Sequence, residues 1–230
     1  MSTRLPPAIR RDIDRVPADI IAKAKNFPAS ILADVAGRRG TLGGRIQAIS
    51  KAMRVAGPAF TVEVRPGDNL MIHAALILAQ PGDVIVVDGK GDLSCALTGS
   101  LMAAHAKAAG IAGFIIDGAV RDTDECANGD FPVFAAGCNP NGPTKAVAGR
   151  INWPVSLAGT VVNPGDLVVG DADGVVVLAR EVAAAVLAGA QAKIDSEAAR
   201  VSDIREGRLV MDWVADALRK AGALGDKEAL

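Results

Sequence analysis

Two continuous runs of apolar residues in the middle of the chain predict strands that are buried on both faces of a sheet. The runs are residues 83–87 (DVIVV) and 111–116 (IAGFII), and turn residues flank both of them. Between the runs, residues 93–109 have the length and composition of a helix, which Gly110 ends as its C′ residue. A strand, a helix and a strand in this order indicate a βαβ unit and therefore parallel strands.

The hydrophobic pattern also predicts elements on both sides of this unit. Residues 53–64 alternate between apolar and other positions, which indicates a pair of strands around Gly57-Pro58. A helix over residues 70–80 follows, and Asp68 can cap its start. Downstream, the pattern predicts a short helix to residue 128, a strand at 132–136, an antiparallel β layer over 155–178, and helices at 180–206 and 211–221.

The chain is predicted to have three parts. Residues 1–27 form a charged arm that contains prolines, residues 28–178 form an α/β domain, and residues 179–230 form C-terminal helices. A short helix at 30–35 begins the domain, with Ser30 as its N-cap. The predicted fold class is α/β, with a parallel βαβ core and an antiparallel β layer.

The triplet Pro-Gly-Asp occurs three times, at residues 66–68, 81–83 and 164–166. Each copy places a turn beside an apolar segment. The pattern is compatible with a faint internal repeat and equally with turn chemistry alone, and the sequence leaves both interpretations open.

Composition excludes several classes of protein. The chain has 25 basic and 26 acidic residues with no dense basic patch, lacks tyrosine, and is only 3% aromatic, so we expect no nucleic-acid partner. No apolar stretch is long enough to cross a bilayer, and the N-terminus has no signal-peptide core, so we expect no membrane partner. The 3 cysteines have no paired spacing. A cytoplasmic location follows as an expectation.

Arg121 and Asp122 are the first candidate site residues, because they follow the second buried strand. The carboxyl ends of parallel strands are where α/β folds bind ligands. An aspartate can hold a hard cation there while an adjacent arginine binds an anionic oxygen. The alternative is structural: residues 122–125 (DTDE) have the spacing of a capping box, in which Asp122 only caps a short helix.

Residues 98–102 (TGSLM) are the second candidate, since free backbone N–H groups at a helix start can bind an anion. The alternative is that Ser100 is simply an N-cap. Gly89-Lys90-Gly91 follows a strand, but its spacing matches no nucleotide-binding motif and gives only a weak signal for a methyltransferase.

Other polar residues have mainly structural interpretations. His73 and His105 are lone histidines on helices, and a satisfied structural histidine is the better interpretation of each. Lys145 follows a glycine- and proline-containing loop; a solvated lysine is the default, although a loop lysine can hold a carboxylate. Glu197 lies on the polar face of the long C-terminal helix, where acidic residues are ordinarily solvated.

Several segments together resemble the RraA-like family, over roughly residues 28–222. Within that family the closest resemblance is to the 4-hydroxy-4-methyl-2-oxoglutarate / 4-carboxy-4-hydroxy-2-oxoadipate aldolases. The matching segments are residues 66–69 (PGDN), 117–122 (DGAVRD), 144–145 (TK), 164–166 (PGD) and 171–174 (DADG). The resemblance implies a swivelling α/β/α sandwich and a divalent-metal pyruvate aldolase that also decarboxylates oxaloacetate. The same fold also serves as a non-catalytic regulator of RNase E, which remains the alternative.

The resemblance implies a role for each matching residue. Asp122 would bind Mg²⁺ or Mn²⁺, with water filling most other positions, and Arg121 would contact the keto oxygen of a small-molecule 2-oxo acid substrate. Lys145 would hold the distal carboxylate of that substrate. Glu197 would reach the site of a neighbouring subunit in a homotrimer or hexamer, in which the C-terminal helices pack on that neighbour. The substrate carboxylate would bind the turn formed by Gly99, Ser100, Leu101 and Met102.

One residue departs from the aldolase pattern. Ser100 stands where these aldolases usually carry Asp or Glu, and a serine supplies no charge and cannot act as a carboxylate base. The departure implies a lower aldolase efficiency or a different 2-oxo acid. The regulatory branch tends to lose the metal aspartate, so the presence of Asp122 favours the enzyme.

Overall fold

The computed structural model describes residues 7–226, 228 and 229. The chain divides into two compact units, residues 1–190 and residues 191–230. The boundary lies inside one long helix, α6 (Arg180–Arg205), which matches the helix predicted for residues 180–206. None of the described helices combines the length and the apolar composition that crossing a bilayer requires. The division into an arm, a domain and C-terminal helices stays a prediction.

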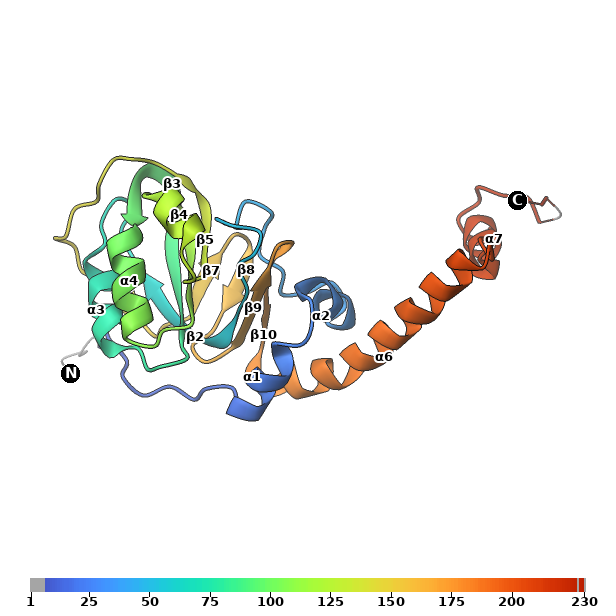
Figure 1. Cartoon of the computed structure of the whole chain (residues 1–230), viewed down its shortest axis with the longest axis horizontal. Coiled ribbons are helices and arrows are strands. Elements are labelled where there is room, and N and C mark those ends of the chain that lie inside the picture. The colour runs from blue at the N-terminus through green and yellow to red at the C-terminus, as the bar shows by residue number, and fades with distance from the viewer. Residues whose placement is uncertain (1–6, 227, 230) are drawn as a thin grey trace, which may run out of the picture. The chain divides into compact units, whose positions relative to one another are not determined.

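A mixed sheet forms the centre of the first unit (Figure 1). Parallel pairing joins β2 to β3, β3 to β4 and β4 to β5, while β1, β6, β9 and β10 pair antiparallel. The strands are, in spatial order, β1 (Gln47–Ala48), β5 (Val133–Cys138), β4 (Gly113–Val120), β3 (Val84–Thr98), β2 (Val55–Glu63), β9 (Leu167–Asp171) and β10 (Gly174–Leu178), with β6 (Arg150–Ile151) beside β2. The predicted α/β class, with a parallel core and an antiparallel layer, is confirmed.

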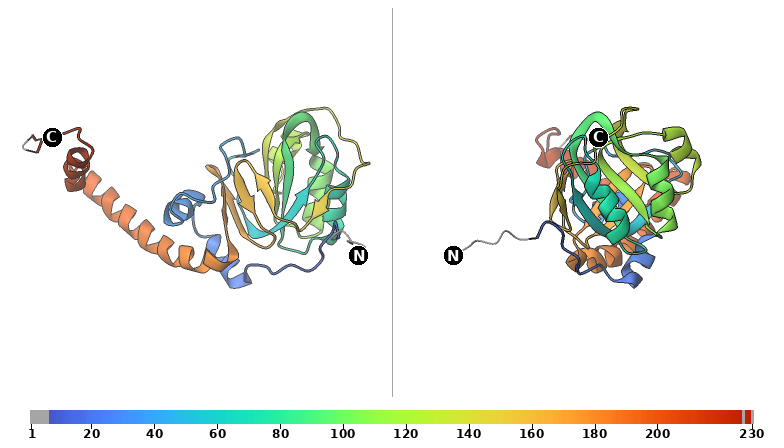
Figure 2. Two further views of the ribbon diagram at one scale, coloured as in Figure 1. Left: turned by 180° about the vertical axis from the view of Figure 1, so that it is seen from behind. Right: turned by 90° about the vertical axis from the view of Figure 1, so that its left-hand side faces the viewer.

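Apolar layers cover both faces of this sheet. On one face α3 (Leu70–Leu78) and α4 (Ser100–Ala108) pack against β2, β3, β4 and β5, and both helices lie in front of the strands in the right-hand view of Figure 2. On the other face the hairpin of β7 (Val155–Leu157) and β8 (Thr160–Val162) shares a core with alternate residues of the same strands. Side chains that alternate between two buried faces explain the continuous apolar runs.

β2 is one strand, so the predicted strand pair at residues 53–64 is wrong. Its first half pairs antiparallel with β9 up to Pro58, and its second half pairs parallel with β3 from Ala59. A Cβ on Gly57 would lie 2.3 Å from the carbonyl oxygen of Gly82, so glycine is needed where the backbones approach closely. The Gly57-Pro58 signal therefore marks a change of partner rather than a turn.

β3 continues to Thr98, so the prediction of a helix from residue 93 is also wrong. Residues 88–98 pair with β4 through register shifts at Asp88/Asp92, Asp92/Ala96 and Ala96/Thr98. Lys90 and Gly91 have positive φ angles of 61° and 70° within this irregular stretch. The Gly89-Lys90-Gly91 segment is thus a bulge inside a strand, which removes the structural ground for a nucleotide-binding loop.

Turn chemistry explains the three Pro-Gly-Asp triplets. Gly67, Gly82 and Gly165 have φ angles of 76°, 91° and 85°. In each turn the aspartate N–H donates to the carbonyl three residues earlier, at 3.0, 3.0 and 3.2 Å. This is the geometry of a type II turn with proline at its second and glycine at its third position.

Arg15 and Val16, just before α1, are tied to the rest of the first unit. Val16 N donates to the Gly165 carbonyl at 3.0 Å, and Arg15 forms a bidentate ion pair with buried Asp83 at 2.8 Å for both bonds. The short helices α1 (Ala18–Ala24) and α2 (Ala29–Val35) follow. The prediction of Ser30 as N-cap is wrong, because Pro28 occupies that position and the Asp171 carboxylate accepts from Ala29 N at 2.8 Å.

Candidate active site at the ends of β3 and β4

The site lies where two neighbouring parallel strands end. Thr98 of β3 pairs with Val120 of β4, and Arg121 N donates to the Thr98 carbonyl at 3.0 Å. The residues that follow each strand, Gly99 and Asp122, therefore meet at one edge of the sheet. They open onto a pocket of about 130 Å³. The pocket is lined by Asn69, His73, Ala96, Leu97, Thr98, Gly99, Leu101, Met102, Arg121, Asp122, Pro143 and Lys145.

Asp122 adopts an unusual backbone conformation and turns its side chain towards the start of α4. Its φ and ψ are 55° and 44°, a left-handed conformation that is uncommon for a residue other than glycine. It precedes α5 (Thr123–Asn128), yet its carboxylate makes no capping hydrogen bond to that helix. Instead Asp122 Oδ2 accepts from Ser100 N at 3.1 Å and from Ser100 Oγ at 3.2 Å. The capping-box interpretation of Asp122 is therefore wrong.

The start of α4 is shaped around this carboxylate. Gly99, not Ser100, is the N-cap, so the N-cap interpretation of Ser100 is also wrong. A Cβ on Gly99 would lie 2.4 Å from Asp122 Oδ2 and 3.0 Å from Arg121 Cγ, so only glycine fits here. Ser100 supplies the carboxylate with two donors in place of the charge that an acidic residue would bring.

The backbone donors of this turn are only partly free. Ser100 N is used by Asp122, and Met102 N donates to the Gly99 carbonyl at 3.1 Å. Leu101 N has no acceptor among the described residues, as is normal in the first turn of a helix. This N–H group is therefore the donor that the turn leaves unused and that an anion could bind.

Arg121 stands beside Asp122 with its side chain about half exposed. Its Nε lies 3.9 Å from Asp122 Oδ2, at the outer limit of an ion pair. A Cβ on Gly142 would lie 3.1 Å from Arg121 Nη1, so the loop before Pro143 approaches the guanidinium closely. The guanidinium therefore retains hydrogen-bonding capacity for a ligand oxygen.

Asp68 holds the loop that carries Lys145. Its buried carboxylate accepts from Thr144 Oγ1 at 2.7 Å, Ala146 N at 2.7 Å and Val147 N at 3.2 Å, and from Leu70 N at 3.0 Å. Burial alone would raise the pKa of Asp68, but these hydrogen bonds outweigh it and lower the pKa to about 2. Asn69, not Asp68, is the N-cap of α3, so the prediction of Asp68 as cap is wrong by one residue, although Asp68 does accept from Leu70 N in the first turn.

Asn69, the N-cap of α3, and His73 in α3 line the pocket, and sequence reasoning assigned neither to a site. Asn69 Nδ2 donates to the Leu97 carbonyl at 2.9 Å, while its Oδ1 is buried without a partner among the described residues. His73 Nε2 is likewise buried and unpartnered within the described chain, so the prediction of a satisfied histidine is wrong for His73. Burial above all, and then the charges of Lys145 and His105, lower the pKa of His73. Asn69 belongs to the PGDN motif at residues 66–69, and this motif was the signal in the sequence that could have identified Asn69 as a site residue.

Glu197 is not among the residues that line this pocket. It belongs to the second unit, on α6, where its carboxylate pairs with Lys193 Nζ at 3.2 Å. The pocket of a single chain therefore contains one carboxylate, that of Asp122.

The donor set of the pocket fits a hard divalent cation that keeps most of its water. Within the described residues, no three His, Cys, Asp or Glu side chains come close enough to hold a metal together. A zinc site would need such a group, whereas Mg²⁺ is commonly bound through one or two carboxylates. The Asp122 side chain is 37% exposed and can offer an oxygen to such a cation.

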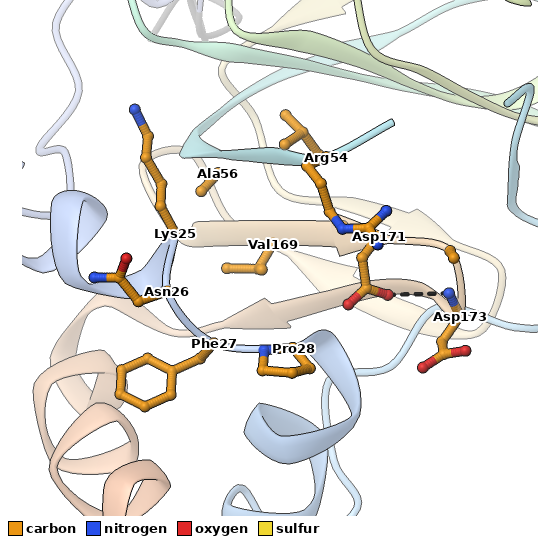
Figure 3. Close-up of a pocket in the computed structure, with 12 residues that line it drawn as sticks. Lys25, Asn26, Phe27, Pro28, Arg54, Ala56, Val169, Asp171 and Asp173 are labelled. Carbon is orange, nitrogen blue, oxygen red and sulfur yellow. Dashed lines mark hydrogen bonds between the residues drawn. The ribbon is translucent and has the colours of Figure 1, made fainter. Parts of the chain in front are cut away.

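A larger cavity of about 540 Å³ lies elsewhere in the first unit (Figure 3). It is formed by the link between α1 and α2, the start of β2 and the end of β9, and includes Lys25, Arg54 and Asp173. Asp171 at its edge is already used, since it accepts from Asp173 N at 3.0 Å and from Ala29 N. None of the predicted site residues lines it.

Comparison with known proteins identifies the family of this chain. The sequence profile of the RraA-like family, described as Aldolase/RraA, matches residues 18–177. The chain belongs to the RraA-like family. A protein of Halalkalibacterium halodurans, provisionally named 4-hydroxy-4-methyl-2-oxoglutarate aldolase, is 40% identical over 193 residues, which are 84% of this chain and 92% of that protein.

Solved structures of RraA-like proteins share the fold. The RNA-processing inhibitor RraA from Thermus thermophilis aligns with a TM-score of 0.61 and 30% identity, over 66% of this chain and 92% of that one. A Geobacillus kaustophilus protein described as S-adenosylmethionine: 2-dimethylmenaquinone methyltransferase aligns with a TM-score of 0.61 and 32% identity. The alignment covers 66% of this chain and 94% of that one. The names of these similar proteins thus span different activities, and the site must decide among them.

Proposed function

We propose that this RraA-like protein is a divalent-metal-dependent pyruvate aldolase. It cleaves a 4-hydroxy-2-oxo acid, of the 4-hydroxy-4-methyl-2-oxoglutarate or 4-carboxy-4-hydroxy-2-oxoadipate type, into pyruvate and a second oxo acid, and it also decarboxylates oxaloacetate. The observation that carries the proposal is the pairing of Asp122 and Arg121 in a pocket that Lys145 also lines.

The residues of this pocket match the parts of such a substrate. A Mg²⁺ or Mn²⁺ ion held by Asp122 would supply positive charge where the C2 oxygen becomes an enolate. Arg121 donates to the same oxygen and stabilises the charge that develops there. Leu101 N, at the positive end of α4, receives the C1 carboxylate, and Lys145 receives the distal carboxylate.

Ser100 has a definite place in this scheme. Its N–H and hydroxyl groups both donate to Asp122 Oδ2 at 3.1 and 3.2 Å, which orients the carboxylate without adding charge. The serine therefore supports Asp122 as a cation ligand, although it does not itself replace a carboxylate base.

We further propose that the chain assembles as a cytoplasmic homotrimer or hexamer in which Glu197 serves the site of a neighbouring subunit. Apolar side chains of the second unit support this assembly, because large ones are exposed next to one another in the sequence. Leu209, Val210 and Trp213 are 65%, 86% and 64% exposed. A neighbouring subunit is the simplest cover for such a surface.

The test is the release of pyruvate by the purified full-length protein with Mg²⁺ or Mn²⁺, measured with a lactate dehydrogenase coupling assay. The substrates are oxaloacetate and a panel of 4-hydroxy-2-oxo acids. Chelation with EDTA and the substitution Asp122→Ala should each lower the rate at least about 1000-fold, equivalent to about 4 kcal/mol of transition-state stabilisation. Wild-type turnover in Asp122→Ala would show that the site is misassigned. A wild-type protein that releases no pyruvate from any substrate would instead favour the RNase E regulator.

A further inference from the structure

The pocket contains few groups that could accept a proton. Its titratable lining residues are His73, Arg121, Asp122 and Lys145. Arg121 and Lys145 are cations at neutral pH and have no free lone pair to offer. The Asp122 carboxylate is already bound by two Ser100 donors and faces the proposed cation. Within the pocket of one chain, the imidazole of His73 is the remaining proton acceptor.

The surroundings of His73 favour this role. His73 lies in the first turn of α3, where its backbone N–H donates to the Asn69 carbonyl at 3.2 Å. Its Nε2 has no partner among the described residues, although a buried imidazole nitrogen ordinarily finds one. A ligand that completed this hydrogen bond would remove the cost of leaving the nitrogen unpaired.

Burial, and after it charged groups on neighbouring elements, lowers the pKa of His73. Lys145 on the loop after Pro143 and His105 on α4 act on it electrostatically, and together with burial, the largest cause, they lower the pKa of His73. A histidine whose pKa is lowered is unprotonated at neutral pH, so it is in the form that accepts a proton.

We propose that His73 is the base that removes the proton of the substrate's C4 hydroxyl group in aldol cleavage. This inference rests on the aldolase function proposed above. It assigns the proton transfer to the chain's own pocket rather than to Glu197 of a neighbouring subunit.

The proposed step balances without a further reactant. The C4 hydroxyl proton moves to the imidazole, the C4 oxygen becomes the carbonyl of the second oxo acid, and the C3–C4 bond breaks. The electron pair of that bond passes to C3 and the C2 oxygen as the enolate of pyruvate, which Arg121 stabilises. The imidazolium then returns its proton, directly or through water, so that C3 becomes the methyl group of pyruvate and His73 is neutral again.

Decarboxylation of oxaloacetate gives the same enolate but needs no such base. Its C4 is a carboxylate, so CO₂ leaves without removal of a hydroxyl proton. A base that acts on the C4 hydroxyl is therefore needed by one reaction of this pocket and not by the other. This difference separates a catalytic role of His73 from a structural one.

The experiment compares both reactions in the full-length protein loaded with Mg²⁺, at pH 8. For His73→Gln we expect the kcat for cleavage of 4-hydroxy-4-methyl-2-oxoglutarate to fall about 100-fold, as for loss of a general base, and the kcat for oxaloacetate decarboxylation to stay within about threefold. The acidic limb of the pH profile of cleavage should also disappear. The control is Lys23→Gln, an exposed residue of α1 outside the pocket, which should leave both reactions within about twofold.

A second variant guards against a merely structural effect. His73→Ala should lose cleavage in the same way, and added imidazole should restore part of it, which a structural role does not predict. Equal loss of both reactions in His73→Gln, or full retention of both, would overturn the assignment. If the wild-type protein releases no pyruvate from either substrate, the aldolase itself fails, and the role of His73 fails with it.

Discussion

Asp68 offers the most direct test of how the first unit builds its site. The substitution Asp68→Asn keeps the shape of the side chain but removes its charge and replaces one acceptor oxygen by an NH₂ group. Thr144 Oγ1, Ala146 N and Val147 N all donate to Oδ2, whereas Leu70 N alone donates to Oδ1. The amide should therefore keep its oxygen towards the loop and place its NH₂ group against Leu70 N, where two donors face each other.

The magnitude follows from these four contacts. Hydrogen bonds to a charged acceptor contribute about 1.5–3 kcal/mol, and neutral ones about 1 kcal/mol. Weakening three bonds by at least about 0.5 kcal/mol each and losing a fourth should therefore lower the free energy of unfolding by about 3 kcal/mol or more. For a chain of this length, the melting temperature should fall by about 5–10 °C. Because the same bonds hold the loop of Lys145, the KM of substrates with a distal carboxylate should rise about tenfold.

Urea unfolding followed by tryptophan fluorescence measures the loss of unfolding free energy. The pH dependence of this loss tests whether the charge of Asp68 causes it. The pKa of Asp68 is lowered to about 2 from an ordinary 3.8, so its charge stabilises the folded state fully above pH 3.8 and loses this effect as pH falls through about 2. The difference in unfolding free energy between wild type and Asp68→Asn should therefore become smaller below pH 3.8.

The control is Asp166→Asn, in another Pro-Gly-Asp turn. Burial raises the pKa of Asp166, so its charge costs stability at neutral pH, and its loss should lower the unfolding free energy less. A loss below about 0.5 kcal/mol in Asp68→Asn, within the range of ordinary surface substitutions, would refute the reasoning. A difference in unfolding free energy between wild type and Asp68→Asn that stays constant down to pH 3 would refute the role assigned to the charge.

The remaining predictions concern the pocket and the second unit. Gly99→Ala should lower kcat for oxaloacetate decarboxylation about 100-fold, because its Cβ would lie 2.4 Å from Asp122 Oδ2, while the melting temperature changes little; normal activity would contradict the close contact. Ser100→Asp should tighten Mn²⁺ binding about tenfold in calorimetry, because a second carboxylate faces the cation; in the metal-free protein it should lower the unfolding free energy by about 1 kcal/mol, because two carboxylates then repel each other. Val210→Asp, at a position 86% exposed, should shift the assembly towards monomers in light scattering, whereas Lys220→Asp should not; an unchanged mass would argue against this surface as an interface.

Periodic and compositional signals in the sequence located most elements of the fold. The buried strand cores, the short helix after Asp122, the antiparallel layer and the long α6 all follow from local patterns of apolar and turn residues. The predictions were wrong where the length of a strand depends on the strand that pairs with it. β2 changes partner at Pro58, and β3 continues past a bulge to Thr98 because β4 pairs with it there.

The candidate site shows the same division between local and tertiary information. Arg121 and Asp122 could be placed at a strand end from the sequence, whereas the turn at Gly99 could be placed only at a helix start. Lys145 could be noticed as a loop lysine, and the family resemblance gave it a role. Their convergence on one pocket depends on the parallel pairing of β3 with β4 and on the four hydrogen bonds of Asp68. A lone histidine such as His73 carries no signal in the sequence, because its missing partner appears only when α3 is packed.

The sequence by itself determined the fold class, the turns of the Pro-Gly-Asp triplets and the residues that begin the site, because each depends on neighbours a few positions away. The tertiary structure alone decided that Asp122 turns away from its own helix towards Ser100, and that Asp68 holds a loop 76 residues further along the chain. Backbone conformation and periodicity are local properties, whereas a hydrogen bond between distant segments exists only after the strands between them have paired.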